Sequence, residues 1–402
     1  MEVGFPYPSE VLEAVVRRIF RIEDVTFGEP PKQPYLVRYR GQLLVEDSAA
    51  AYDQLVQALR PYRITPLFRW DEGRHAIFLV PGVPQPKPGN AMVNLVLFIL
   101  TLLSVLLTGA LYGMEQELPG DPLQAALVLI QRGWPFAVSL IAILGAHEFG
   151  HYLVGRYHGV HVTLPYFIPL PFSPFGTMGA FINMKEQPKN RRVLLDIGLA
   201  GPLSGLIVAI PVLYLGLKLS SLNPLPAVPS QDLLLSMEGN SILYLLMKFL
   251  VFGQLLPAPI SYGTGGPLVY WIRYYLTGQP FPFGGLDVLL GPVAWAGWAG
   301  ILVTGLNLIP AGQLDGGHML YVLFGRKTAR RILPFILALL VGLGFFWAGW
   351  WLWAALIFLL GRTYAEPLDQ ITPLDSKRKI LAVLALILFL LTFTPVPLIL
   401  VQ

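Results

Sequence analysis

Long stretches with few or no charged side chains dominate the sequence from residue 91 onward. A helix of about 20 apolar residues is long enough to cross the roughly 30 Å hydrocarbon layer of a membrane. The pattern therefore predicts membrane-spanning helices in six stretches: 91–112, 134–154, 197–217, 288–309, 332–361 and 380–401. The fifth stretch has room for two shorter helices that turn near Gly344, so we expect about seven transmembrane helices.

Two other apolar stretches have interruptions that argue against a regular spanning helix. Residues 162–184 contain several prolines and glycines, and irregular backbone at membrane depth must be buried in protein or line a wet cavity. We expect a re-entrant loop there, followed by a short strand at 179–184. Residues 241–256 are short and carry Lys248, which favours an interfacial or re-entrant helix.

The first 80 residues have the patterns of a small soluble α+β domain. Apolar residues at helical spacing predict helices at 10–20 and 48–59, the second capped by Asp47 or Ser48. Alternating apolar residues predict two hairpins: 35–39 with 42–45 around Gly41, and 64–70 with 75–80 around 71–73. The Pro-rich residues 81–90 are expected to form a stiff linker.

The composition agrees with a membrane protein, because 54% of the residues are hydrophobic, 13% are charged and the mean hydropathy is +0.60. A net charge of +4 gives no indication of nucleic-acid binding, and the absence of cysteine excludes disulfide bonds and thiolate metal sites. We expect a mainly α fold: a polytopic membrane helical bundle with a re-entrant β-hairpin or loop, preceded by the soluble α+β domain. The expected division is 1–80, the linker 81–90 and a membrane domain at 91–402.

Basic residues indicate the orientation of the helices, because Lys and Arg are enriched in cytoplasmic loops. We place the soluble domain in the cytoplasm and two helices in 332–361. The loops 156–192, 325–331 and 362–379 then lie inside with 13 Lys and Arg, whereas 114–132 and 218–287 lie outside with four. A single helix in 332–361 would put the basic residues of 362–379 outside, so the charges favour two helices.

One motif in the second predicted helix carries chemistry. His147 and His151 are four residues apart, so on a helix both imidazoles point from one face toward a single metal ion. Glu148 lies beside them, where a carboxylate reaches a water molecule on the metal. Two histidines and a glutamate in this pattern are typical of zinc hydrolases, with the glutamate as general base. Ionisable groups inside a membrane segment are costly, which favours a functional role.

Two histidines leave zinc short of a third protein ligand, and Asp315 is the best candidate. It follows a Pro/Gly break at the end of the helix predicted at 288–309, where an interrupted helix aims a carboxylate inward. In the orientation above, the helices at 134–154 and 288–309 run in the same direction. We therefore expect Asp315, His147 and His151 all to lie near the cytoplasmic side.

These two motifs together resemble the site-2 protease family of intramembrane zinc metalloproteases. The resemblance rests on His147-Glu148-x-x-His151 and on Asn307-x-x-Pro310-x-x-x-Leu314-Asp315-Gly316, with matching flanks at 176–182 and 199–202. The ending at 391–397 and the N-terminal soluble domain are similar to the subgroup named for plant ethylene-dependent gravitropism-deficient and yellow-green proteins and their bacterial relatives. The resemblance covers about residues 90–402.

The resemblance implies an intramembrane endopeptidase that cuts peptide bonds in or near transmembrane segments of membrane-protein substrates. It implies a Zn²⁺ cofactor on His147, His151 and Asp315, Glu148 as catalytic base, and Asn307 as the residue that holds the substrate strand or polarises its carbonyl. The stretch 176–184 would receive an unwound substrate strand, with these residues in contact: Gly176, Gly179, Ala180 and Phe181. The expected partners are transmembrane substrates, the lipid bilayer and a cytosolic regulator at the soluble domain. We expect a bacterial cytoplasmic membrane, with the N-terminus in the cytoplasm.

Two other classes of function remain open from the sequence. An ion-coupled transporter or channel would show paired repeats and charges in several spans, whereas the ionisable groups here cluster at two motifs. A catalytically inactive relative that acts as a membrane chaperone is argued against by the intact Glu148. Among the other histidines, His318 is a candidate neighbour of the metal site, and His158 and His161 are interpreted as solvated loop residues.

Overall fold

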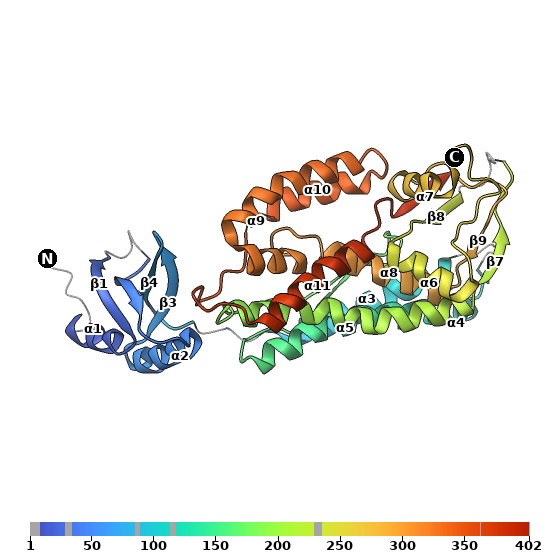
Figure 1. The fold of residues 1–402 in the computed structure, drawn as a ribbon. Coiled ribbons are helices and arrows are strands. Elements are labelled where there is room, and N and C mark those ends of the chain that lie inside the picture. Colours follow the sequence, from blue (N-terminus) through green and yellow to red (C-terminus); the bar gives the residue numbers. More distant parts are fainter. Residues whose placement is uncertain are drawn as a thin grey trace.

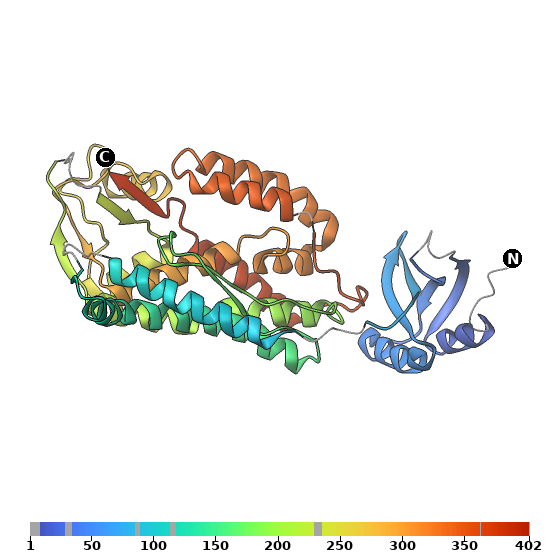
Figure 2. The same ribbon diagram turned by 180° about the vertical axis from the view of Figure 1, so that it is seen from behind.

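The computed structural model describes residues 9–28, 34–84, 89–112, 118–228, 235–361 and 363–401. A small α/β unit made of the first 84 residues lies at one end of an elongated helical body, as Figures 1 and 2 show from opposite sides. The fold is mainly helical, with a small sheet region at the N-terminus, as the sequence predicts.

The N-terminal unit is a four-stranded antiparallel sheet in the order β1-β2-β4-β3, with two helices on one face (Figure 1). Its elements are α1 (Ser9–Arg17), β1 (Phe20–Phe27), β2 (Val37–Leu43), α2 (Ser48–Leu59), a 3-10 turn at Arg60–Tyr62, β3 (Ile64–Asp71) and β4 (Arg74–Pro81). Asp47 caps α2 by accepting hydrogen bonds from the next backbone amides. Glu72 and Gly73 both have positive φ, which is the backbone of a tight hairpin turn between β3 and β4.

The expected hairpin around Gly41 is wrong. Residues 37–43 form one continuous strand, and one of its partners is β1, a strand that the sequence pattern does not predict. The reason is close backbone contact: a Cβ atom on residue 41 would lie 1.9 Å from the carbonyl oxygen of Arg21. Gly41 is therefore required inside a sheet at an irregularity of β1, and it does not mark a turn.

The centre of the helical body is formed by four helices that pack tightly on one another. They are α3 (Ala91–Leu111), α4 (Pro122–Tyr157), α5 (Arg191–Lys218) and α8 (Pro292–Asn307). Small residues of α8 allow this packing, since a Cβ on Gly297 would lie 2.6 Å from the Leu213 backbone of α5. Among the described residues, α3, α4 and α5 are long and apolar enough to cross a membrane.

The last third of the chain contains α9 (Asp315–Leu343), α10 (Gly349–Leu360) and α11 (Ser376–Thr392). The expected pair of helices in 332–361 is present, since α9 ends at Leu343 and α10 begins after a turn. The expected helix at 380–401 is wrong beyond Thr392, because Pro395 and Pro397 cannot supply helical amide donors. The chain ends instead in β10 (Leu398–Val401), which pairs with β8 (Leu235–Glu238).

The far end of the body from the sheet is built around a buried charge cluster. It contains β7 (Ser221–Pro224), α6 (Ile242–Phe252), α7 (Gly266–Thr277) and β9 (Leu286–Leu289). Lys248 of α6 is fully buried, with its Nζ 3.1 Å from Glu238 Oε1 and 3.2 Å from Asp287 Oδ1. Helix α6 thus turns Lys248 inward toward two carboxylates, whereas Ile242, Leu246 and Leu250 on the same helix are exposed. The interfacial or re-entrant placement of this helix stays a prediction.

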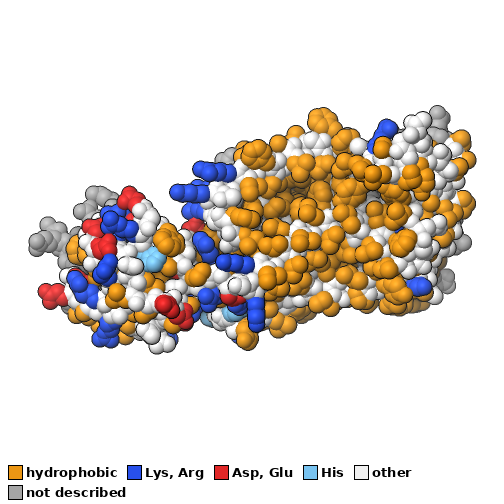
Figure 3. All heavy atoms as spheres, viewed as in Figure 1, with side chains coloured by type: hydrophobic (Ala, Val, Ile, Leu, Met, Phe, Trp, Pro, Cys, Tyr) orange, Lys and Arg blue, Asp and Glu red, His pale blue; other side chains and the backbone are white. Residues whose placement is uncertain are grey.

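A loop at 363–375 joins the helical body to the N-terminal sheet. Residues 368–370 run parallel to β3: the Phe68 amide donates to Leu368 O and the Gln370 amide donates to Phe68 O, both at 3.0 Å. The loop also carries Ile371 into the apolar core of the N-terminal unit. Basic side chains gather at this junction, whereas apolar side chains cover most of the helical body (Figure 3).

Candidate active site

Helix α4 carries both histidines of the motif on one buried face. His147 and His151 are 4% and 7% exposed and lie one turn apart. The Nδ1 of His151 lies 2.7 Å from the carbonyl oxygen of Ile197. Because that contact places a proton on Nδ1, the lone pair of Nε2 faces the interior and is available to a metal ion.

Asp315 begins α9, directly after the irregular segment that follows α8. Two glycines let the backbone fold back tightly at this point: a Cβ on Gly316 would lie 1.9 Å from Leu308 O, and one on Gly317 would lie 2.4 Å from Gly312 O. The carboxylate of Asp315 is 13% exposed and faces the histidine pair. The break in the helix therefore aims Asp315 inward, as the Pro/Gly pattern predicts.

The three side chains converge on one point. The Nε2 atoms of His147 and His151 are 3.2 Å apart, and they lie 3.3 Å and 3.4 Å from the carboxylate oxygens of Asp315. In a tetrahedral zinc site with bonds of about 2.0–2.2 Å, neighbouring ligand atoms lie about 3.3 Å apart. The donor set, its spacing and its burial therefore fit a zinc ion, with a fourth position left for water or substrate.

Glu148 lies at the same site and faces a strand. Its side chain is buried, and the backbone amide of Ile182 donates a hydrogen bond to its carboxylate. Glu148, the metal-ligand triad, Ala180 and Phe181 all line one pocket of about 440 Å³. The strand that the sequence predicts near the metal is therefore in direct contact with the expected base.

That strand is half of a hairpin, β5 (Tyr166–Pro169) with β6 (Thr177–Phe181). Within the described residues β6 pairs only with β5, so its second edge is open toward the pocket. The expected contact residues divide into two groups. Ala180 and Phe181 line the pocket, whereas Gly176 lies under α3, where its carbonyl accepts a 2.5 Å hydrogen bond from Ser104 Oγ. Gly179, in β6 with φ of 105°, does not line the pocket.

Asn307 ends α8 beside the metal position. Its amide nitrogen lies 3.3 Å from His147 Nε2, and its side chain lines the pocket. The structure thus brings together the residues expected from the two motifs: His147, Glu148, His151, Asn307 and Asp315.

Two glycines of α5 lie against the site, although their spacing alone indicates only helix packing. The spacing Gly201-x-x-x-Gly205 predicts a face for helix packing. In the structure that face meets the two histidines of the motif: a Cβ on Gly201 would lie 2.0 Å from His151 Nε2, and one on Gly205 would lie 3.2 Å from His147 Nδ1. The pattern identifies close packing, but nothing local in it names the partner.

The other histidines have different surroundings. His318 lines the pocket beside Gly198, and its buried Nδ1 has no hydrogen-bond partner among the described residues. His158 lies 3.0 Å from an Asp196 oxygen, and His161 lies 2.8 Å from Glu186. Both contacts lie outside the pocket.

Comparison with known proteins agrees with this geometry. The family model described as "Peptidase family M50" matches residues 135–348, which is more than half of the chain and includes both motifs. The chain is 29% identical, over 97% of its length, to the "Probable zinc metalloprotease EGY2, chloroplastic" of Arabidopsis thaliana. It is 31% identical over 67% of its length to the protein of that name from Oryza sativa subsp. indica. No solved structure matches.

The chain spans only 66% and 44% of the length of these two relatives. Both are named chloroplastic, which gives no support to the expected bacterial cytoplasmic membrane. The names and the apolar helices do support a membrane protein with zinc as its metal. From the extent of the family match and the position of both motifs within it, the chain belongs to peptidase family M50, the family of the site-2 proteases.

Proposed function

We propose that the protein is an intramembrane zinc endopeptidase that hydrolyses peptide bonds in or near transmembrane segments of membrane-protein substrates. The observation that carries the proposal is the buried triangle of His147, His151 and Asp315, with Glu148 beside it, inside a bundle of apolar helices. The substrates and partners of the chain are part of this proposal.

The open edge of β6 supports a way to hold the substrate. A transmembrane helix bonds its amides internally, so it must unwind before an enzyme reaches a peptide bond. An extended substrate segment added to β6 would replace the lost hydrogen bonds with strand-to-strand bonds. Because Ile182 contacts Glu148 just beyond the strand, a segment held on β6 would lie against the base.

The hydrolysis can be followed through the residues of this chain. Zinc bound by the triad would polarise the substrate carbonyl and acidify a water molecule. Glu148 takes a proton from that water while the water oxygen bonds to the carbonyl carbon of the substrate. The C–N bond then breaks, and Glu148 returns the proton to the departing amine. Water is thereby divided between the new carboxyl and amino ends.

Asn307 is placed to assist at the carbonyl oxygen. Its amide lies within 3.3 Å of a ligand nitrogen, so a carbonyl approaching the triad meets a neutral donor there. A donor aimed at the developing oxyanion stabilises the transition state more than the ground state. We assign Asn307 this role.

The N-terminal unit has a role of its own in the proposal. We assign this unit to the side of the membrane that carries the Lys- and Arg-rich loops, and the site opens toward that side. We propose that the unit filters or recruits substrates or binds a regulator. An ion-coupled transporter and an inactive chaperone are the competing functions. Neither accounts for a buried carboxylate beside the two histidines that accepts a hydrogen bond from the Ile182 amide, just beyond the open strand β6.

The first test is Glu148→Gln. We expect cleavage of a transmembrane peptide by the purified protein to fall by about 100- to 10,000-fold, because the proton acceptor is lost while the residues proposed to bind zinc are untouched. Zinc content, measured by elemental analysis, should stay at the wild-type level. Cleavage at the wild-type rate would rule out Glu148 as the base.

The matched comparison is Asp315→Ala. This change removes a ligand, so zinc content and cleavage are expected to fall together. Stoichiometric, tightly held zinc in Asp315→Ala would mean that another residue completes the donor set.

A further inference from the structure

A second cavity lies between the N-terminal unit and the helical body. Its volume is about 850 Å³, which is in the range of roughly 300–1,000 Å³ common for ligand sites. One wall is the sheet face that α1 and α2 leave uncovered, and the opposite wall is formed by residues of the helical body. We call this cavity the junction groove.

The sheet side of the junction groove is apolar. Leu67 of β3 and Phe78 and Val80 of β4 lie there, and Tyr35 packs edge-on against Phe78 with ring centroids 5.2 Å apart. None of these side chains is fully buried, although each is large and hydrophobic. Such a surface gains free energy when another apolar group covers it.

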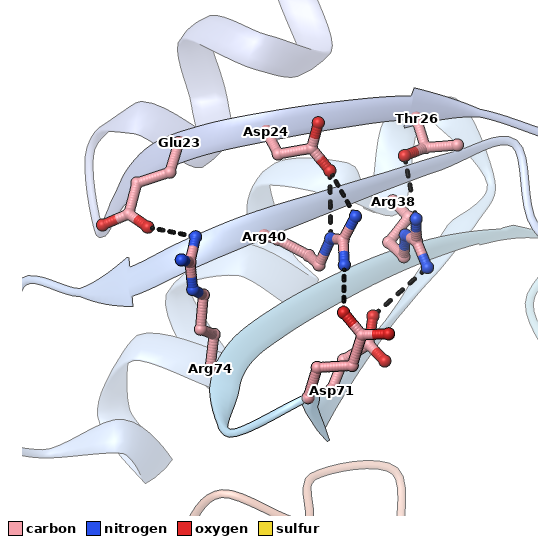
Figure 4. Close-up of polar contacts among 8 residues, drawn as sticks. Glu23, Asp24, Thr26, Arg38, Arg40, Asp71 and Arg74 are labelled. Carbon is pink, nitrogen blue, oxygen red and sulfur yellow. Dashed lines mark hydrogen bonds and ion pairs between the residues drawn. The ribbon is translucent and has the colours of Figure 1, made fainter.

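The charged groups of the groove are already paired. Arg38 binds Asp71 at 3.2 Å in a network of ion pairs on the open sheet face (Figure 4). Arg326 forms an ion pair with Glu366. Arg69 donates from Nη1 to the carbonyl oxygens of Pro367 and Leu368 at 3.0 and 2.6 Å. The groove therefore selects its occupant by shape and apolar character and not by net charge.

On two walls, residues that line the zinc pocket are followed within three positions of the chain by residues that line the junction groove. Tyr364 and Ala365 line the zinc pocket, and Glu366, the next residue, lines the groove. On the other wall, Met184 lines the zinc pocket and Gln187 lines the groove. Three residues span at most about 10 Å of extended chain. The two cavities therefore have lining residues close enough for one extended peptide to contact both.

Resting on the proposed function, we propose that the junction groove binds the water-exposed segment that continues from the cleaved transmembrane helix of the substrate. That segment lies extended and places one or two apolar or aromatic side chains against Leu67, Phe78 and Val80. The strand edge of β6 thus holds the segment that is cleaved. The junction groove binds the adjoining substrate residues on the side of the N-terminal unit and selects among their side chains.

The test uses two synthetic substrates that share one transmembrane helix. One has a 12-residue flank with two apolar side chains, and in the other those side chains are replaced by serine. Wild-type protein is expected to cleave the first with a kcat/KM about five- to tenfold higher, through KM, because one or two apolar groups become buried. Equal values for the two substrates would overturn the proposal.

A pair of matched variants locates the effect. Leu67→Glu places a charge in the groove, whereas Leu44→Glu makes the same change at a 57% exposed position outside it. We expect Leu67→Glu to lower kcat/KM for the apolar-flank substrate to the value for the serine-flank substrate. The thermal midpoint of the purified variant reports whether it folds. Leu44→Glu should keep the preference. If Leu67→Glu still prefers the apolar-flank substrate, the flank does not bind in the junction groove.

A third measurement separates this proposal from the proposed function. A photoreactive benzoylphenylalanine at residue 67, combined with Glu148→Gln, is expected to cross-link to the apolar flank without any cleavage. Cross-linking with no cleavage of either substrate by wild-type protein would support binding of the flank in the junction groove and contradict the proposed protease function. Cleavage without cross-linking and without a flank preference would support the proposed protease function and contradict binding of the flank in the junction groove.

Discussion

At residue 201 the space available beside the metal ligands is smaller than one methyl group. A Cβ there would overlap the imidazole of His151, since it would lie 2.0 Å from Nε2. We therefore predict that Gly201→Ala displaces His151, weakens zinc binding by about 100-fold and lowers cleavage in parallel. Zinc titration with a competing chelator measures the change.

The control for that prediction lies one helical turn away. A Cβ on Gly205 would lie 3.2 Å from His147 Nδ1, a contact that small shifts relieve. Gly205→Ala should therefore cost much less affinity than Gly201→Ala. Wild-type zinc affinity in Gly201→Ala would show that α5 moves freely away from the ligands.

Lys248 is a second residue whose surroundings make a sharp prediction. Replacing it by methionine leaves Glu238 and Asp287 buried near one another without their cation. Removal of one partner from a buried ion cluster costs about 3–5 kcal/mol. We expect Lys248→Met to lower the thermal midpoint of the purified protein by many degrees. Lys218→Met, at an exposed position, should leave it nearly unchanged; equal midpoints would show that the cluster adds no stability.

At the scale of elements, the strand-like segment 368–370 holds the N-terminal sheet on the helical body. Its hydrogen bonds lie on both sides, since the Asp369 amide donates to Lys189 O at 2.8 Å and the Gln370 amide donates to Phe68 O. The hydroxyls of Ser48 and Thr372 lie 2.8 Å apart and add a side-chain contact. One short segment thus bridges β3 and the residues just before α5.

Gln370→Pro tests that bridge. Proline removes the amide that donates to Phe68 O, while Gln370→Ala keeps it. We predict that the proline variant docks its N-terminal unit more weakly by about 1 kcal/mol. Limited proteolysis in the linker at 81–90 should then be faster for the proline variant than for the alanine variant. Equal rates for the two would mean that this hydrogen bond does not hold the units together.

The elements that could be predicted are those whose signal is local. The helices at 91–111 and 48–59 and the β3–β4 hairpin follow from hydrophobic runs, caps and turn residues within a few positions. The pairing of β1 with β2 and the contact of 368–370 with β3 join segments whose mutual fit leaves no trace in either sequence. The same distinction holds at the site, where a short motif names the histidines but only the packed structure connects Gly201 with them.

At the scale of the whole molecule, the contact between the N-terminal unit and the helical body determines whether the number of membrane crossings between them is even or odd. The N-terminal unit and residues 366–372 are in contact, so they lie on the same side of any membrane. An even number of crossings must therefore lie between residue 89 and residue 363. The six helices α3, α4, α5, α8, α9 and α10 satisfy this if each crosses once, which agrees with two helices and not one in 332–361.

Removal of residues 1–88 tests the role of the N-terminal unit as a whole. We expect cleavage of a short, helix-destabilised peptide to be largely kept, because all residues of the zinc pocket remain. Cleavage of a substrate with a long flank should change, because the sheet wall of the junction groove is gone. Loss of both activities, together with a lower thermal midpoint, would mean that the unit serves only to stabilise the membrane domain.

The contact between Arg69 and Leu368 also has a consequence for biosynthesis. These residues are 299 positions apart, and nearly all of the membrane helices lie between them. At about 5–20 residues per second, a ribosome needs roughly 15–60 s to make that interval. The N-terminal sheet therefore emerges first, with β3 paired to β4 but its outer edge unpaired while the helices insert. The sheet gains residues 368–370 as its last strand-like partner only if α9 and α10 return the chain to the same side of the membrane. Formation of this contact therefore requires that the helices have inserted correctly.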